Sequence, residues 1–206
     1  LKNKYYLHMK NYFSILFIFF FVLTNAQEQW TEKSVTQFQD TLNKHYATKG
    51  ESPLMEEDFK VFKHLDFYPI NSKFAVQAHF IRTKKEKKFK MKTTGTRTPE
   101  YVKYGEYHFE IDGKKMSLNV YQNIELIKKE GYEDYLFLPF SDLTCGKESY
   151  IGGRYIDMRI PKSDTVLIDF NKAYNPYCAY NYKYSCPIVP LENDLDLEIL
   201  AGVKKF

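Results

Sequence analysis

The spacing of hydrophobic positions changes once along the chain, near Phe74. Between residues 31 and 48, apolar side chains recur every three to four positions, as Val35, Phe38, Leu42 and Tyr46. This spacing predicts an amphipathic helix. A second helix is predicted from the Ser-Pro pair at positions 52 and 53, because serine is a good N-cap and proline suits the first turn. Three acidic residues follow at positions 56 to 58, near the positive end of that helix.

From Phe74 onward, apolar residues alternate with polar ones, which is typical of strands. The predicted strands are Phe74–Phe80, Phe89–Met91, Tyr107–Ile111, Met116–Val120, Tyr135–Phe140, Tyr150–Ile160, Thr165–Phe170 and Leu195–Leu200. The pair Asp112-Gly113 predicts a tight hairpin between two of them. No helical pattern separates the strands after Leu65, so a parallel sheet is not expected. We therefore predict a mainly β fold, an antiparallel β-barrel or strongly bent β-sandwich of about eight strands with two N-terminal helices.

The first 26 residues have the three parts of a secretory signal. Translation is expected to start at Met9, Lys10 supplies the positive charge, and the apolar run Tyr12–Leu23 follows. Small residues then precede a predicted cut before Gln27. The alternative is a membrane anchor, but a run of about a dozen apolar residues is short for a bilayer, which needs roughly 20. We expect a periplasmic or secreted protein with no membrane span after signal cleavage.

The remaining chain is expected to form one structural unit, made of a helical segment at 27–66 and a β domain at 67–206. The whole chain has 30 Lys and Arg against 26 Asp and Glu. Three of the lysines (Lys2, Lys4 and Lys10) lie in the signal, which leaves 27 basic residues against 26 acidic ones. A nearly neutral protein is not expected to bind nucleic acid by bulk electrostatic attraction. Nothing in the sequence indicates the oligomeric state.

Three cysteines follow the predicted cut. In an oxidising compartment Cys178 and Cys186 are expected to form a disulfide, which leaves Cys145 unpaired. The alternative is that Cys178 and Cys186 are buried free thiols. We predict no metal site and no cofactor, because no histidines have zinc-site spacing and no Cys-x-x-Cys is present.

Polar groups are concentrated between Tyr135 and Cys186. The segment contains LFLPFSDLTCGKESY, GGRYID and LIDFNKAYNPYCAY, and CPIVPLEND follows from Cys186. These motifs resemble the bacterial family called domain of unknown function 1684, with its GGRYLD and LDFNxAYNPxCAY signature. The chain departs from that pattern at Cys145, where serine is common, and at Ile156, where leucine is common. The resemblance covers nearly all of the chain after the predicted cut and implies no activity.

One interpretation of this polar group is a pocket for a small ligand, in which the Arg154 guanidinium recognises an anion. The predicted ligand-binding residues are Arg154, Tyr155, Asp157, Asp169, Asn171, Tyr174 and Asn175. The other interpretation is a buried network in which Arg154 pairs with Asp157 or Asp169. The predicted function is a small-ligand-binding β module. The alternatives are a structural or interaction protein of the cell envelope and a carboxylate-based hydrolase, so enzymatic activity stays open and no catalytic residue is assigned.

Overall fold

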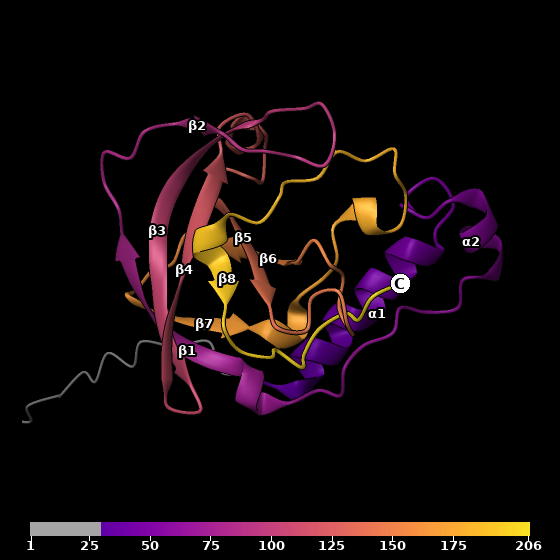
Figure 1. Cartoon of the computed structure of the whole chain (residues 1–206), viewed down its shortest axis with the longest axis horizontal. Coiled ribbons are helices and arrows are strands. Elements are labelled where there is room, and N and C mark those ends of the chain that lie inside the picture. The colour runs from indigo at the N-terminus through magenta and orange to yellow at the C-terminus, as the bar shows by residue number, and fades with distance from the viewer. Residues whose placement is uncertain (1–29) are drawn as a thin grey trace, which may run out of the picture.

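The computed structural model describes residues 30–206, and the predicted signal peptide at 1–26 lies outside this range (Figure 1). Helix α1 (Glu32–Ala47) opens the described part of the chain. Thr31 caps it, with its hydroxyl oxygen accepting a hydrogen bond from the Ser34 N–H at 3.2 Å. Val35 and Tyr46 are fully buried on its inner face. The predicted first helix is thereby confirmed.

The second helix, α2 (Glu56–Val61), begins later than the Ser-Pro signal predicts. The Ser52 hydroxyl accepts a hydrogen bond from the Leu54 N–H at 3.3 Å, so Ser52 starts a turn and does not cap a helix. That turn places Leu54 in a buried cluster with Tyr46 and Leu65. Both helices lie on one side of the molecule in Figure 1, and the long strands β3 and β4 lie on the other.

Eight strands form a curled half-barrel sheet, which confirms the mainly β fold. The strands are β1 (Ala75–Arg82), β2 (Phe89–Lys90), β3 (Glu100–Ile111), β4 (Lys114–Asn123), β5 (Tyr135–Asp142), β6 (Arg154–Arg159), β7 (Thr165–Asp169) and β8 (Asp194–Leu195). Their order in the sheet is β6-β5-β4-β3-β1-β7, with β2 on β3 and β8 on β5. Every pairing is antiparallel except that of β8 with β5.

The hairpin between β3 and β4 turns at Asp112-Gly113, as predicted. Both residues have positive φ, 51° and 76°, which matches the right-handed twist of the flanking strands. A bulge between Lys103 and Gly105 interrupts the β3–β4 register. At that point the side chains of β3 change the face on which they lie. Tyr101 therefore packs on one face of the sheet and Tyr107 on the other.

Two predicted strands are shorter in the structure. The Tyr150–Ile160 segment becomes a strand only at Arg154, because Gly153 turns the chain with φ +82°. Of the Leu195–Leu200 segment, only Leu195 lies in a strand, the two-residue β8 (Asp194–Leu195). Ile199 is buried, but side chains of the core bond its backbone in place of a strand ladder. For example, the Ile199 carbonyl accepts a hydrogen bond from Arg154.

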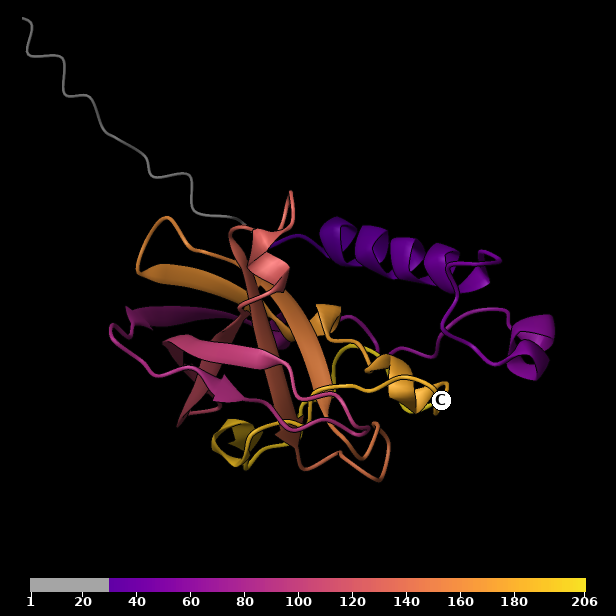
Figure 2. The same cartoon turned by 90° about the horizontal axis from the view of Figure 1, so that it is seen from above.

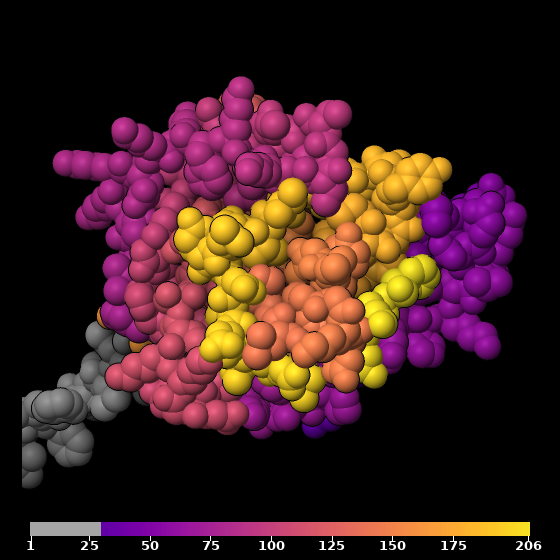
Figure 3. Space-filling model, in the orientation of Figure 1, coloured from indigo at the N-terminus to yellow at the C-terminus, as the bar shows by residue number. Residues whose placement is uncertain are grey.

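The two faces of the sheet carry different clusters. The main core lies on one face and includes Leu136, Leu138 and Ile156. The opposite face of β5 and β6 carries an aromatic cluster that includes Phe137 and Tyr155. Figure 2 shows α1 as a separate layer beside the strands. In Figure 3 the C-terminal third, in orange and yellow, covers the middle of the visible face.

Candidate functional site

Arg154 lies in the main core and not in a pocket. Its side chain is 0% exposed, and its Nη2 donates to Asp142 Oδ2 at 2.6 Å. Nη2 also donates to the Ile199 carbonyl at 2.9 Å, and Nη1 donates to the Ala201 carbonyl. The expectation that Arg154 pairs with Asp157 or Asp169 is therefore wrong. Its partner is an aspartate at the end of the neighbouring strand β5.

The alternation of side chains along β6 explains this difference. Residues an odd number of positions apart in a strand point to opposite faces, so Arg154 and Asp157 cannot lie on the same side. Arg154 shares the core face with Ile156, whereas Asp157 shares the opposite face with Tyr155. Strand alternation alone therefore predicts that Arg154 and Asp157 lie on opposite faces.

Both carboxylate oxygens of Asp142 have hydrogen-bond partners. Its Oδ1 accepts hydrogen bonds from the Thr144 N–H at 2.7 Å and the Thr144 hydroxyl at 2.5 Å. Thr144 Oγ1 in turn lies 2.7 Å from the Ser149 hydroxyl. These groups are all buried, so the network joins β5, β6 and the C-terminal segment inside the core.

Three more of the predicted site residues have structural contacts. Asn171 Nδ2 donates to Asp169 Oδ1 at 2.9 Å and to the Asn71 carbonyl at 3.0 Å. The Asn71 N–H donates back to Asn171 Oδ1 at 2.9 Å, which ties the start of the sheet to the end of β7. Asn175 is fully buried, and its Nδ2 donates to the Lys204 carbonyl at 2.8 Å.

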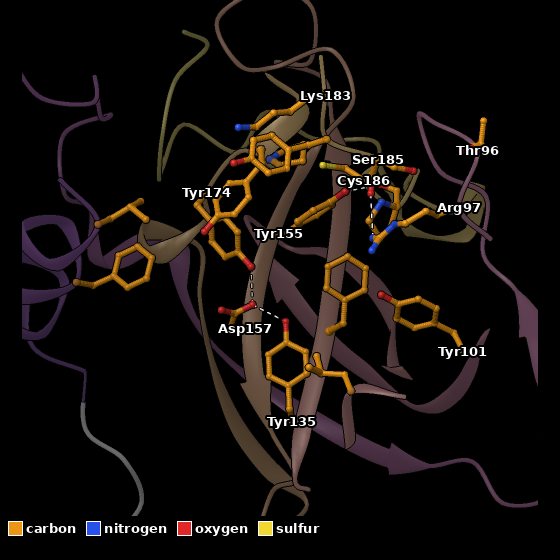
Figure 4. Close-up of a pocket in the computed structure, with 18 residues that line it drawn as sticks. Thr96, Arg97, Tyr101, Tyr135, Tyr155, Asp157, Tyr174, Lys183, Ser185 and Cys186 are labelled. Carbon is orange, nitrogen blue, oxygen red and sulfur yellow. Dashed lines mark hydrogen bonds between the residues drawn. The ribbon is translucent and has the colours of Figure 1, made fainter. Parts of the chain in front are cut away.

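The other three predicted residues, Tyr155, Asp157 and Tyr174, line one cavity (Figure 4). The cavity has a volume of about 750 Å³ and lies between α1 and the aromatic face of β5 and β6. Eight of its 18 lining residues are aromatic. The aromatic residues are Phe38, Tyr101, Tyr135, Phe137, Tyr155, Tyr174, Tyr177 and Tyr184.

Asp157 is the carboxylate of this cavity. The hydroxyls of Tyr135 and Tyr174 donate to the same oxygen, Oδ1, at 2.7 Å and 2.5 Å (Figure 4). Burial, and next the Asp157 charge, raise the pKa of both phenols, so both stay protonated donors. The second oxygen, Oδ2, has no hydrogen-bond partner or cation within 4.0 Å among residues 30–206. Asp157 is exposed, so this oxygen is open to solvent or to a ligand.

The two cations that line this cavity, Arg97 and Lys183, lie away from Asp157. In the view of Figure 4, Lys183 and Asp157 are at opposite ends of the cavity, with Tyr174 and Tyr155 between them, and Arg97 is on the far side of Tyr155. Arg97 Nη2 donates to the Ser185 carbonyl at 3.1 Å. The Lys183 ammonium lies 5.0 Å from the centre of the Tyr184 ring.

A second cavity of about 560 Å³ adjoins the first and shares Phe38 and Asp157 with it. It is bounded by β6 and β7, the two strands at the ends of the sheet order. Asp169 lines it, 5% exposed, with Lys172 Nζ 3.8 Å from its Oδ2.

Sequence reasoning missed several lining residues. Tyr135 and Phe137 have the same alternation as Tyr155 and Asp157, so the strand register places them on one face. The alternation of side chains along β5 could therefore have identified Tyr135 and Phe137 from the sequence. Arg97 and Lys183 come from irregular segments, and no local pattern brings them to the cavity.

Cys145, Cys178 and Cys186 are free thiols in this structure. The Cys178 N–H donates to Cys186 Sγ at 3.2 Å, so these two residues lie side by side next to the cavity. A hydrogen bond from the Cys186 thiol lowers the pKa of Cys178 to about 6, and the same bond raises the pKa of Cys186. The predicted disulfide stays a prediction.

Within residues 30–206, no group of three or more His, Cys, Asp or Glu side chains is arranged to hold a metal ion. None of the helices in that range is both long enough and apolar enough to cross a membrane.

Comparison with known proteins gives a family and a similar fold. The family model described as "Protein of unknown function (DUF1684)" matches residues 60–204. A similar solved structure is the solution NMR structure of an uncharacterized protein of Haloarcula marismortui. It is 28% identical with a TM-score of 0.67, and the match covers 84% of this chain and 93% of that one. No curated protein matches.

Proposed function

Because the chain belongs to the DUF1684 family of proteins of unknown function, we propose from the geometry of the site that the protein binds a small molecule in the cavity beside α1. The proposal keeps the predicted binding of a small ligand but moves the binding site from Arg154 to the aromatic cavity. Arg154 and Asp142 hold the scaffold, and Tyr155, Asp157 and Tyr174 contact the ligand.

One observation carries this proposal: a carboxylate with an open oxygen lies in an aromatic cavity of about 750 Å³. Small-molecule sites usually enclose about 300–1,000 Å³, with apolar walls and few polar groups that fix the orientation of the ligand. The core face of the sheet has no such arrangement, because Asp142 and Thr144 already satisfy each other there. The aromatic walls supply contact area, and Asp157 supplies direction.

The alternatives have less support. Asp157 and Asp169 both line the adjoining cavity, as a carboxylate-based hydrolase would need. However, Asp169 caps a short 3-10 turn and accepts hydrogen bonds from Asn171, which is a structural role. A structural or interaction role in the cell envelope stays a prediction.

A neutral solvatochromic dye such as Nile red tests the proposal, together with native mass spectrometry for a co-purifying molecule. Phe38 lines the cavity from α1 and is only half-buried, so Phe38→Ala should leave the fold intact. We expect dye affinity to fall about tenfold through the lost aromatic contact. The neighbouring exposed Gln37 supplies a matched control, Gln37→Ala, with no expected effect. Absence of saturable dye binding and of any bound molecule would contradict the proposal, as would equal affinities in both variants.

We also propose that the protein is exported, on the strength of the signal pattern at 1–26. Intact-mass measurement on fractionated cells tests this idea. A mature chain beginning at or near Gln27 would support export, and a membrane-bound species that retains Tyr12–Leu23 would contradict it.

A further inference from the structure

We propose that Cys178 and Cys186 form a redox-active pair that exchanges disulfide bonds with small-molecule disulfides and thiols. Cys178 reacts first with the incoming molecule, and Cys186 then displaces that molecule by forming its own bond to Cys178. This inference goes beyond the predicted disulfide, because it assigns the pair a reversible reaction and an order of attack. It does not depend on the proposed binding function.

The two cysteines are in contact in the reduced protein. Cys178 belongs to the 3-10 turn Tyr177–Ala179, and its N–H donates to Cys186 Sγ at 3.2 Å. The backbone of Cys186 is held by Thr94. The Cys186 N–H donates to Thr94 Oγ1 at 3.1 Å, and the Cys186 carbonyl accepts from the Thr94 N–H at 2.9 Å. One cysteine is thus held beside the other, which favours a reaction within the chain over one between molecules.

The accessibility of the two cysteines differs, and this difference sets the order of reaction. Cys178 is partly exposed, whereas Cys186 is only 8% exposed. A disulfide from solution therefore reaches Cys178 first. Cys145 is also partly exposed, but within residues 30–206 no hydrogen bond joins it to a second cysteine. It can react with a small disulfide, but it has no partner to complete the exchange.

The hydrogen bond between the two thiols supports the same order. It lowers the pKa of Cys178 to about 6, so this sulfur is mainly a thiolate, the attacking form, at neutral pH. The same contact is the largest cause of the raised pKa of Cys186. Once Cys178 is bonded to another sulfur its negative charge is gone, and the pKa of Cys186 falls. The Cys178 N–H and the Arg97 charge then favour the Cys186 thiolate.

The exchange takes two steps, with a small disulfide RSSR, such as glutathione disulfide, as the oxidant. In the first step the Cys178 thiolate attacks one sulfur of RSSR, the S–S bond breaks, and RS⁻ leaves. In the second step the Cys186 thiolate attacks Cys178 Sγ of the mixed disulfide, and the second RS⁻ leaves. The two cysteines are oxidised and RSSR is reduced to two RSH, which take up the two protons that the cysteines lose.

The reverse reaction is also expected. A hydrogen bond that stabilises the Cys178 thiolate stabilises the reduced pair, and this makes the disulfide easier to reduce than a purely structural one. Excess reduced glutathione should therefore open the Cys178–Cys186 bond in the native protein, without denaturant.

Acid-quenched mass spectrometry tests the order of attack. Fully reduced protein is mixed with excess glutathione disulfide, and the modified cysteine is mapped at intervals. The wild type should carry a short-lived glutathione adduct on Cys178 and end as the Cys178–Cys186 disulfide. Cys186→Ser keeps a hydrogen-bond donor beside Cys178 but cannot close the disulfide, so the adduct on Cys178 should persist. The control Cys145→Ser should react like the wild type.

The lone buried thiol gives the complementary test. In Cys178→Ala, Cys186 should react at least about tenfold more slowly than Cys178 does in Cys186→Ser, because disulfide exchange depends on access and thiolate character. A first adduct on Cys186 or Cys145, a persistent adduct in the wild type, or no reaction would each overturn the proposal. The wild-type results need no variant, so they decide even if a variant fails to fold. A bond that excess reduced glutathione cannot open in the native protein would show a structural disulfide and overturn the exchange role.

Discussion

Arg154 is the largest fully buried side chain among the described residues. Its charge is balanced by Asp142 on β5 and by two carbonyls of the C-terminal segment. A guanidinium cannot lose its proton, so it requires such partners wherever it is buried. This side chain therefore joins parts of the chain that are distant in sequence.

Replacing Arg154 tests this role. Arg154→Met leaves Asp142 buried without its cation, and we expect the free energy of unfolding to fall by about 3–5 kcal/mol. Urea denaturation measures the change. Arg159→Met, on the same strand but with an exposed ion pair to Asp134, should cost no more than about 1 kcal/mol. Wild-type stability for Arg154→Met would contradict the structural role.

Cys178 and Cys186 give a pH-dependent prediction. Because the pKa of Cys178 is lowered to about 6, its thiolate form, which reacts, appears as the pH rises through 6. In fully reduced protein, alkylation of Cys178 by iodoacetamide should follow that profile, measured by peptide mass spectrometry. Cys186→Ala removes the hydrogen bond and should move the midpoint toward the ordinary thiol value of about 8.5. An unchanged midpoint would show that the bond is not the cause.

The same two cysteines are predicted to form a disulfide under oxidising conditions. In the reduced form the Cys178 N–H already contacts Cys186 Sγ at 3.2 Å, so the two residues are neighbours before oxidation. Thiol counting under denaturing, non-reducing conditions should then find one free thiol per chain, that of Cys145. Three free thiols would refute the disulfide.

At the scale of elements, the sequence predicted the strands better than their ends. Alternation located β1, β3, β4 and β5, and Asp112-Gly113 located the tightest turn. These signals are local, because side-chain direction and turn geometry depend on neighbouring residues. The β3 bulge and the irregular course after β8 were not predictable in this way. They depend on partners that are distant in sequence, such as the Arg154 side chain bonding the Ile199 carbonyl at 2.9 Å.

For the candidate site, too, local patterns could be read from the sequence, whereas contacts between distant segments could not. Tyr155 and Asp157, two positions apart on β6, line one cavity, although the sequence grouped them only because they are near each other. Arg154, Asp169 and Asn175 were grouped with them because they are near in sequence, although their side chains are in the core or in loop contacts. Arg97 and Lys183 reach the cavity from irregular segments, and only the tertiary structure reveals them.

The turn before β6 gives the element-scale prediction. A Cβ at Gly153 would meet the Phe140 carbonyl oxygen at 2.6 Å, in addition to the strain of φ +82°. Gly131 has a similar φ of +81°, but a Cβ there meets nothing within 4 Å. Gly131→Ala should therefore cost only the backbone strain, about 1 kcal/mol. Gly153→Ala should cost about 1–3 kcal/mol more, because the clash is with backbone. Equal thermal stability of the two variants would contradict this explanation.

At the scale of the whole molecule, the C-terminal segment is part of the core. Ile199 and Ala201 are fully buried and supply the Arg154 carbonyl contacts, and Val203 is 1% exposed. The Val203 N–H bonds the Ala173 carbonyl at 2.9 Å. The segment therefore closes the main core and attaches it to the cluster beneath the helices.

Truncation tests this role. A chain that ends at Glu198 loses these side chains and both carbonyls, and we expect it to lack a cooperative unfolding transition by circular dichroism. A chain that lacks only Phe206, a side chain 56% exposed, should keep that transition. Cooperative unfolding of the shorter chain would show that the sheet is stable without its C-terminal cover.

The position of this segment also bears on when the protein can fold during its synthesis. Ile199 and Ala201 supply partners for a charge in the middle of the core, so a nascent chain cannot complete that core while these two residues are still held in the ribosomal tunnel. The half-barrel must then reach its native state after they emerge, as one late event and not strand by strand. A chain that stays open until that point is also one that a threading translocase can still accept.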